Sequence, residues 1–496
     1  MSGFPRTIRG TIAAAAVLAL APATAAPVFA APAADSTLVV GEPAGFASVQ
    51  AALDAAHPGD TVVVRPGIYR ERPIIRSPVV LRGEPGAILD GEGDGVVLTV
   101  MATARISGLT LRGSGRDLVR EHAGVMVLEA DDVVIEDLVL EDVLFGIYAK
   151  QSARPLIRRN QVEGKPLPMG ERGDGIRLWY CQGGEIVGNT LTRTRDLVIW
   201  FSSNLEVRGN VVRDSRYGVH YMYSDHNRFE DNQFRNNHVG AFIMYSSDIE
   251  FRGNLFLEGY GASGVGLGLK DADDIRAIEN AFVGNAAGVT LDNSPTSVGV
   301  VNVFRGNLVA YNDIGISLLP SVHSNEFSGN SFVENTTPVS VSGGGDALEN
   351  AWRHNDWSGY AGFDEDGDEV GDTPYRHERV ADALFARHPE LRWLVLSPAA
   401  GALDLLGRLF PLLEPRPVVI DSAPALAPPA GGFGTYVSTD AAGEDDRAGG
   451  DLAAAGALFA AGLLAFGSTA WLGRRRRWSG GSAGSSGPAR RTDGGP

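Results

Sequence analysis

The chain has 496 residues, of which 44% are hydrophobic and 8% aromatic, and it contains 63 glycines and 27 prolines. This composition excludes a disordered protein and a single small core, and the many glycines favour β structure with frequent turns. The net charge of −17 argues against a nucleic-acid partner, because an acidic surface repels phosphates. A single cysteine, Cys181, excludes an internal disulfide framework, so stability has to come from packing.

Both ends of the chain carry segments typical of export and membrane attachment. Residues 1–30 are predicted to be a signal peptide, with Arg6 and Arg9 before an apolar stretch and small residues at the cleavage site. Residues 452–472 are uncharged and long enough for one membrane-spanning helix, and Arg474–Arg477 would hold 473–496 in the cytoplasm. The sequence therefore predicts a body in the periplasm or on the outer face of the cytoplasmic membrane, anchored by a single span. A sorting signal removed after export explains the same C-terminal pattern.

Residues 31–60 are predicted to form an N-terminal cap before the first strand. The segment Ser48–Ala56 places Val49, Ala52 and Leu53 on one side, which predicts a helix with one apolar face. The open end of a stack of strands would expose sheet edges and core, so a covering helix is expected there.

Asparagine residues recur at intervals of about 22 residues along the middle of the chain. They are Asn160, Asn189, Asn210, Asn232, Asn254, Asn280, Asn307 and Asn330. A repeat of this length holds three short strands and three turns, and stacked repeats pair each strand with its equivalents in the neighbouring coils. The sequence thus predicts an all-β fold, a right-handed single-stranded parallel β-helix over residues 61–363. The asparagines are expected to form a ladder at one turn, each side chain bonding the next coil.

Segments of equal length can be aligned without gaps, one from each coil. They are Gly146–Ser152, Gly175–Cys181, Asp196–Ser202, Gly218–Ser224, Gly240–Ser246, Gly264–Lys270, Gly288–Ser294 and Gly315–Ser321. The first and third residues after each start are almost all aliphatic, as Val219 is, which predicts a strand that buries these positions. The second and fourth residues should then face outward.

In the middle coils these outward positions carry aromatic, thioether and imidazole side chains instead of polar ones. They are Trp179, Trp200, His220, Met222, Phe242 and Met244. A row of exposed apolar residues usually marks a binding surface, so this set is predicted to bind a partner. The alternative is that a loop or the C-terminal segment simply covers the row.

Two groups of residues have the chemistry of metal ligands. The imidazole of His220 and the thioethers of Met222 and Met244 are a soft set suited to copper, especially Cu(I), and predict transient copper binding. In residues 364–375, carboxylates at every second position suit one hard cation and predict a Ca²⁺ site. The calcium candidates are Asp364, Asp366, Asp368 and Asp372.

The sequence offers little support for catalysis. Tyr223–His226 is the nearest candidate for abstracting a sugar proton, and only Lys150 and Arg177 could hold a polyuronate chain on the outward face. We therefore assign no catalytic residue and predict that the chain is not an enzyme. A polyuronate lyase or C5-epimerase is the alternative function.

Several segments of the chain resemble the NosD family. The most specific are Gly218–Ser224, Gly240–Ser246, Trp357–Tyr375 and Pro417–Pro424. The resemblance covers residues 48–424 and implies an exported, non-catalytic scaffold for the maturation of nitrous oxide reductase. Proteins of this family work with an ABC transporter, composed of an ATPase and a permease, and with a copper chaperone lipoprotein. Together they help to assemble the copper–sulfur centre of the reductase.

Residues 376–425 are expected to be a docking segment in this setting. The stretch Val380–Leu413 has apolar helical patches broken at Pro389, Pro398 and Pro411, and we expect it to dock on the permease. Residues 426–451 would then be a linker to the predicted membrane span.

Overall fold

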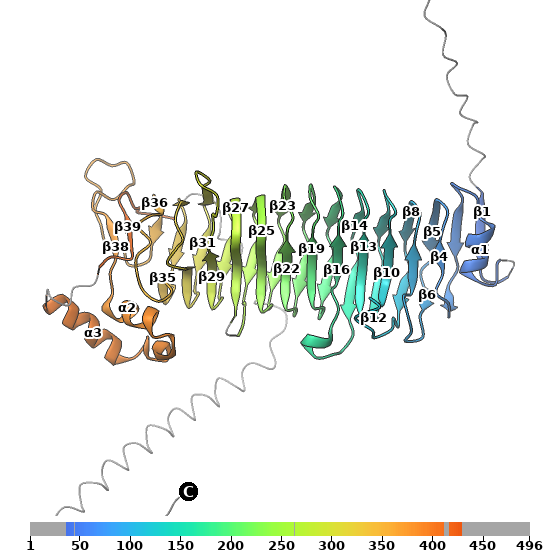
Figure 1. The fold of residues 1–496 in the computed structure, drawn as a ribbon, viewed down its shortest axis with the longest axis horizontal. Helices are drawn as coiled ribbons and strands as arrows, with labels where there is room; N and C mark the ends of the chain where they lie inside the picture. Colours follow the sequence, from blue (N-terminus) through green and yellow to red (C-terminus); the bar gives the residue numbers. More distant parts are fainter. Residues whose placement is uncertain (1–35, 44, 262, 411–415, 429–496) are drawn as a thin grey trace, which may run out of the picture. The chain divides into compact units, whose positions relative to one another are not determined.

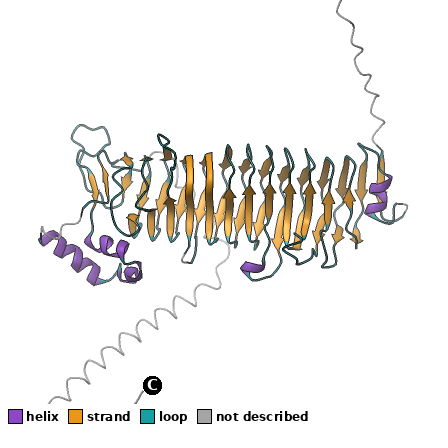
Figure 2. Ribbon diagram, viewed as in Figure 1, coloured by secondary structure: helices purple, strands orange, loops and turns teal. Residues whose placement is uncertain are grey.

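Residues 36–43, 45–261, 263–410 and 416–428 are described by the structure, a computed structural model of the chain. They form a parallel β-solenoid of about 14 coils, which confirms the all-β fold class (Figure 1). Within a coil the chain visits three faces, and each strand pairs in parallel with its equivalents in the neighbouring coils. Figure 2 shows helices only near the two ends of the solenoid and in one loop at its side.

The strands of the three faces follow one another in chain order. The first face consists of β4 (Ile74–Ile75), β7 (Leu98–Val100), β10 (Ala123–Leu128), β13 (Phe145–Lys150), β16 (Ile176–Trp179), β19 (Asp196–Trp200), β22 (Tyr217–Met222), the first part of β25 (Val239–Arg252), the first part of β27 (Val265–Ile278), β29 (Ala287–Asp292), β32 (Ile314–Leu318) and β35 (Thr337–Val341). The second face consists of β1 (Thr37–Val40), β2 (Thr61–Val64), β5 (Val79–Gly83), β8 (Ala104–Ser107), β11 (Val134–Glu136), β14 (Leu156–Arg158), β17 (Glu185–Val187), β20 (Glu206–Arg208), β23 (Asn227–Glu230), the remainders of β25 and β27, β30 (Asn302–Arg305), β33 (Asn325–Ser328) and β36 (Ala351–Arg353). The third face consists of β3 (Gly67–Tyr69), β6 (Ala87–Asp90), β9 (Thr110–Arg112), β12 (Val139–Val143), β15 (Gln161–Gly164), β18 (Thr190–Thr192), β21 (Val211–Arg213), β24 (Gln233–Arg235), β26 (Leu255–Leu257), β28 (Ala281–Val283), β31 (Leu308–Ala310), β34 (Ser331–Val333) and β37 (Asp356–Trp357).

The structure confirms which alternate residues of the first-face strands point into the core and which point outward. In β22, Val219 and Tyr221 are fully buried, whereas His220 and Met222 are only partly buried and lie on the outer side. Tyr221 is the one aromatic residue at this inward position among the aligned coils, and the amide of Asn227 donates a hydrogen bond to its hydroxyl. The polar end of the ring is thus satisfied inside the core.

The asparagine ladder is also confirmed. Each side-chain amide donates to the side-chain carbonyl of the asparagine one coil further, as Asn232 Nδ2 does to Asn254 Oδ1 at 2.9 Å. The same oxygen accepts the backbone N–H of Asn232 at 3.0 Å. At the far end, Asp421 takes the place of the next asparagine and accepts from Asn355 Nδ2 at 2.9 Å. The ladder therefore satisfies buried backbone groups at a turn that has no strand pairing of its own.

The start of the solenoid differs from the predicted domain boundary. Strand β1 precedes helix α1 (Val49–Ala55) and already pairs with β2 along its whole length. The helix connects these two strands at the blue end of Figure 1 and buries Val49, Ala52 and Leu53. Because strand pairing begins at Thr37, the structure does not support a separate N-terminal cap over residues 31–60.

The C-terminal segment packs against the last coils. Strands β38 (Tyr375–His377) and β39 (Val419–Asp421) form an antiparallel pair, and the Tyr375 ring stacks on Trp357 at 4.3 Å. Between them lie α2 (Val380–Arg387), the 3-10 helix η2 (Pro389–Leu394) and α3 (Pro398–Leu409). Helix α2 is fastened to the loop after β35 by a hydrogen bond from Gly343 N to Ala386 O at 2.8 Å. The helical breaks predicted at Pro389 and Pro398 are thus present.

The predicted signal peptide (1–30), membrane span (452–472) and cytoplasmic tail (473–496) lie outside the described residues. Within residues 36–43, 45–261, 263–410 and 416–428, no helix combines the length and apolar character needed to cross a bilayer.

Candidate functional site: the outer wall of the first face

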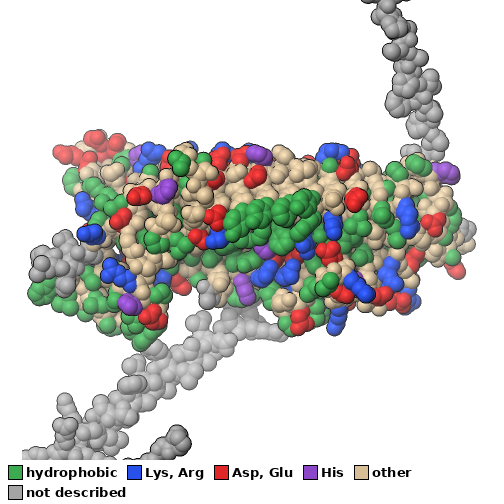
Figure 3. Space-filling model, in the orientation of Figure 1, with side chains coloured by type: hydrophobic (Ala, Val, Ile, Leu, Met, Phe, Trp, Pro, Cys, Tyr) green, Lys and Arg blue, Asp and Glu red, His purple; other side chains and the backbone are tan. Residues whose placement is uncertain are grey.

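The six residues predicted to bind a partner lie in two neighbouring columns on the outside of the first face. We call this set the outer wall. Trp179, Trp200, Met222 and Met244 are successive partners in the strand register, and His220 pairs with Phe242 beside them. Figure 3 shows hydrophobic side chains gathered in one continuous patch over strands β16 to β25. The sequence therefore placed these side chains on one surface correctly.

Two lysines bound the column of the tryptophans and methionines. Lys150 precedes Trp179 in the register and Lys270 follows Met244. Lys270 makes an ion pair of 2.7 Å with Asp292, and Lys150 lies 4.0 Å from Glu121. The apolar part of the column is thus four coils long and ends at a charge on both sides.

The register of one coil differs from the alignment. The sequence placed Gly264 at the start of its segment, but Gly266 is the residue in line with Gly288, and Leu267 is the partner of Ala241. Several glycines follow one another at every second position here, so spacing alone selected the wrong one. The error of two residues keeps the inward and outward sides unchanged, but it places Gly268 beside Phe242. A Cβ atom at this position would clash with the Phe242 ring, so the glycine makes room for it.

Two of the positions predicted to face outward at this end of the row are not exposed. Tyr148 and Val198 are fully buried, in contrast to the expectation for the second position of a coil. Tyr148 belongs to a small second core that Leu167, from the loop around the 3-10 helix η1 (Met169–Glu171), and Trp179 also contact. The alternative of a covering loop is therefore correct for this end of the row, while the wall from Trp179 to Met244 remains partly accessible.

Beneath the wall lies a charged cluster that the sequence analysis missed. Asp174 and Asp196 have no exposed surface, and both stand at the corner where the first face begins. Asp196 binds the guanidinium of Arg216, accepts from the backbone N–H of Tyr217, and lies 3.1 Å from His220 Nδ1. Asp174 accepts from Arg195 Nε at 3.0 Å. The only sequence signal was that Asp196 occupies a position where most other coils have glycine.

The pKa values of the two carboxyl groups in this cluster are shifted in opposite directions. Burial raises the pKa of the Asp174 carboxyl above its ordinary value, and the guanidinium of Arg195 does not offset this effect. Burial acts in the same direction on Asp196, but the hydrogen bonds from His220 and Arg216 outweigh it and lower the pKa of this carboxyl. Asp196 is therefore the ionised partner that holds His220.

The contact with Asp196 sets the orientation of the His220 ring. A carboxylate only accepts, so Nδ1 carries a proton, and in the neutral form of the ring Nε2 has a free lone pair. Within the described part of the chain, no group forms a hydrogen bond with Nε2. The ring edge packs on Trp200 and Tyr217, each at 5.0 Å between centroids. This arrangement, with one ring nitrogen held by a carboxylate, is common among histidines that bind a metal through the other nitrogen.

Arg177 lies among aromatic rings at the covered end of the wall. Its guanidinium is 4.9 Å from the Tyr148 ring centroid and 5.1 Å from those of Trp179 and Trp200. Its nearest carboxylate is Asp174 at 3.6 Å. The cation that the sequence analysis assigned to a polyuronate substrate is thus held inside the protein by its own rings.

A second aromatic column runs along the turn next to the wall and was not predicted. Tyr180, Phe201, Tyr223 and Tyr245 stack at centroid distances of 4.7, 5.4 and 5.1 Å. Each follows directly after a wall tryptophan or methionine, so the signal was an aromatic residue at the same place in successive coils. The three tyrosines of this column are exposed, which extends the apolar surface around the turn.

The acidic loop brings three of its four predicted ligands together. Oxygens of Asp364, Asp366 and Asp368 lie within 4.8 Å of one another, whereas Asp372 is not part of this group and accepts from Glu365 N. The backbone N–H groups of Glu369 and Gly367 lower the pKa of Asp364, while the charge of Asp368 raises that of Asp366. Calcium binding at this loop stays a prediction.

Known proteins similar to this chain agree with the resemblance seen in its segments. A family model described as "Periplasmic copper-binding protein (NosD)" matches residues 158–362. A curated relative from Pseudomonas aeruginosa, named "Probable ABC transporter binding protein NosD", is 29% identical over 417 residues, which are 73% of this chain and 87% of the relative. A relative of the same name from Stutzerimonas stutzeri is 29% identical over 73% of this chain and 86% of its own length. The chain is thus similar to NosD proteins over most of its length.

Among solved structures, this chain is similar to the A-module of a mannuronan C-5 epimerase, AlgE6, from Azotobacter vinelandii. The TM-score is 0.51 at 16% identity, over 63% of this chain and 95% of the module. Such a likeness shows the fold alone. The sequence candidate for sugar chemistry, Tyr223–His226, is divided in space: Ser224 is buried and accepts from Ser202 N, and His226 pairs with Asp248 at 2.7 Å.

Proposed function

We propose that this chain is a scaffold outside the cytoplasm for the maturation of nitrous oxide reductase. It would work with an ABC transporter ATPase and permease and with a copper chaperone lipoprotein, and help to assemble the copper–sulfur centre. The family description as periplasmic and copper-binding supports the compartment and the metal, and the names of the relatives support the transporter. Residues 452–472 would anchor the scaffold to the membrane with a single helix.

The observation that carries this proposal is the outer wall. A solvated strand face normally bears polar side chains, but here two tryptophans, two methionines and a phenylalanine stand side by side on a rigid solenoid. Large apolar side chains that are already held in place lose little entropy when a partner covers them. We infer that the chaperone or the reductase docks on this wall.

His220, Met222 and Met244 would contribute soft ligands to copper in transit. The thioethers of Met222 and Met244 are register partners, and His220 lies on the same strand as Met222 with Nε2 directed away from Asp196. Thioether and imidazole ligands prefer Cu(I), and weak thioether ligands suit a metal that has to be passed on.

Replacing Met222 and Met244 together with alanine tests the wall. We expect the affinity for the copper chaperone or the reductase to fall by about tenfold or more, because each well-packed interface residue contributes on the order of 1–2 kcal/mol. Assembly of the copper–sulfur centre in cells should fall in parallel, as measured by the absorbance of the purified reductase. Met101→Ala removes an exposed thioether that is not part of the outer wall and serves as the matched control. Unchanged binding and assembly in the double variant would contradict the proposal.

The C-terminal helices provide a second docking surface in this proposal. Trp393 and Leu396 are 78% and 86% exposed, and Leu405, Leu409 and Phe410 continue the apolar surface along α3. Such a surface outside the solenoid would dock on the permease. This inference rests on exposed apolar side chains near a membrane.

Leu405→Ser together with Leu409→Ser should abolish capture of the permease in a detergent pull-down. The loss of two exposed leucines should leave folding unchanged within about 0.5 kcal/mol. Leu348→Ser, at an exposed leucine outside these helices, is the control and should still capture the permease. Recovery of the permease with the double variant would rule out this surface.

A further inference from the structure

A cavity separates the end of the solenoid from helix α2. Its volume is about 400 Å³, and it lies between strand β35, the loop after it, one side of α2 and the segment that leads into β39. This size is within the usual range for pockets that bind small molecules. It lies in a different part of the chain from the outer wall and from the acidic loop.

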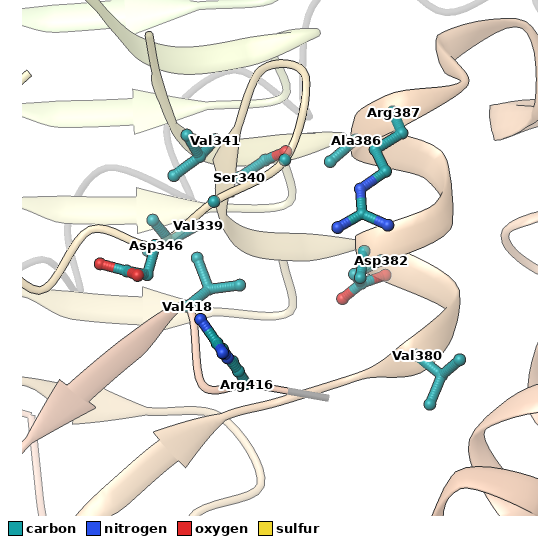
Figure 4. A pocket seen from close by; sticks show the side chains of 13 residues that line it. Val339, Ser340, Val341, Asp346, Val380, Asp382, Ala386, Arg387, Arg416 and Val418 are labelled. Atoms are coloured by element: carbon teal, nitrogen blue, oxygen red, sulfur yellow. The ribbon is translucent and has the colours of Figure 1, made fainter. Parts of the chain in front are cut away.

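The lining of the cavity combines apolar side chains with four charged ones, Asp346, Asp382, Arg387 and Arg416. Val339, Val341 and Val418 form the apolar part, and Figure 4 shows Arg387 and Asp382 on α2, with Arg416 and Asp346 on the other side of the cavity. Neither arginine forms a hydrogen bond or an ion pair with another described residue. The guanidinium groups of these two exposed arginines are free to bind a ligand with anionic groups.

The position of Arg387 is set by the neighbouring loop. A Cβ atom on Gly344 would lie 3.0 Å from Arg387 Nε and 3.2 Å from its Cγ, so the glycine lets the loop lie directly on this side chain. The hydrogen bond from Gly343 N to Ala386 O holds the loop and the helix together at the same point. Arg387 therefore lies against this loop at the edge of the cavity and stays exposed.

Asp382 supplies a buried carboxylate that lacks hydrogen bonds. Its side chain is 4% exposed, and neither oxygen accepts a hydrogen bond of good geometry from the described residues. His377 Nε2 lies 2.9 Å from Asp382 Oδ2, and the guanidinium of Arg379 lies 3.8 Å from the same oxygen. Both of these basic neighbours of the carboxylate are therefore on its Oδ2 side. Oδ1 has no partner, and a buried acceptor in this state is destabilising until a donor reaches it.

We propose that this cavity binds a small organic acid that carries both anionic groups and a hydrogen-bond donor. Arg387 and Arg416 bind the carboxylate or phosphate groups, and a hydroxyl or amino group of the ligand donates to Asp382. The carbon chain packs on the valines of the wall. This site is independent of the proposed role in copper-centre maturation and could be correct if that role were wrong.

L-malate and succinate are the probes that test this proposal, because they differ only in one hydroxyl group. Titration calorimetry on the full chain should show malate binding with a Kd below about 1 mM, and succinate binding at least about tenfold more weakly. Arg387→Gln and Arg416→Gln should each weaken malate binding by about tenfold or more, because a charge-assisted contact is lost.

Arg376→Gln is the matched control, since Arg376 is an exposed arginine of β38 that does not line the cavity. It should leave malate binding unchanged, and circular dichroism should report the same fold for all three variants. Absence of any heat from malate and succinate with the original chain would overturn the proposal. If Arg387→Gln and Arg416→Gln bound malate as tightly as the original chain, the proposal would also be overturned. If the original chain bound malate and succinate with equal affinity, Asp382 would not have the proposed role.

Discussion

Asn254→Ala should lower the free energy of unfolding by about 3–5 kcal/mol, because several buried hydrogen bonds are lost at once. Asn254 Oδ1 accepts from the backbone N–H of Asn232 at 3.0 Å and from its side-chain amide at 2.9 Å. Asn254 Nδ2 donates to Phe229 O at 2.9 Å and to Asn280 Oδ1 at 3.0 Å. Alanine leaves these groups buried without their hydrogen-bond partners.

Urea unfolding followed by circular dichroism measures this effect. Gln233→Ala, on the neighbouring strand β24, removes an exposed amide and should change the stability by no more than about 0.5 kcal/mol. A loss of similar size in the two variants would show that the ladder does not stabilise the solenoid in this way. In a repeat protein the damage spreads to the adjacent coils, so the transition should also broaden.

Asp196→Asn should destabilise the chain by about 3–5 kcal/mol at neutral pH, because a buried charge pair loses one member. Asp196 is fully buried and is the carboxylate bound by both Arg216 and His220. The amide that replaces it is neutral and cannot compensate the guanidinium. Glu206→Gln, at an exposed glutamate of β20, is the control and should have a small effect.

The effect of Asp196→Asn should depend on pH in a defined direction. The pKa of Asp196 is lower in the folded than in the unfolded chain, so its ionised form stabilises the fold above the unfolded value of about 3.9. This stabilisation is lost as the pH falls through the folded pKa, and the difference between the original chain and the variant should shrink there. Asp174 acts in the opposite direction, because burial raises its pKa and protonation favours the fold. A constant difference across the acid range would contradict the role given to Asp196.

Local periodicity explains the parts of the fold that could be predicted. Alternation at every second residue placed Val219 in the core and His220 on the outside without knowledge of the turn geometry. The asparagine ladder followed in the same way, because a buried amide repeated once per coil has the next amide as its natural partner. Both inferences depend on contacts between equivalent positions, which the repeat itself specifies.

Contacts between residues that are not equivalent could not be predicted. The pairing of Asp196 with His220, and the covering of Tyr148 by the loop that contains Leu167, depend on how corners and loops fold back on the first face. The wrong choice of Gly264 has a related cause, because the length of the preceding turn decides the register and spacing alone does not. Similarly, Asp372 remained outside the acidic cluster because the bend of the loop decides which carboxylates meet.

By itself, the sequence determined the solenoid, its asparagine ladder and the side of the sheet on which the wall residues lie. These features depend on contacts between equivalent residues of successive coils, and the sequence repeat specifies those contacts. Only the tertiary structure decided which part of the wall is accessible, which carboxylate holds His220, and that a cavity lined by two arginines lies beside α2. These features arise where the repeat ends or where a loop leaves it. There a side chain meets neighbours that no periodic pattern can specify.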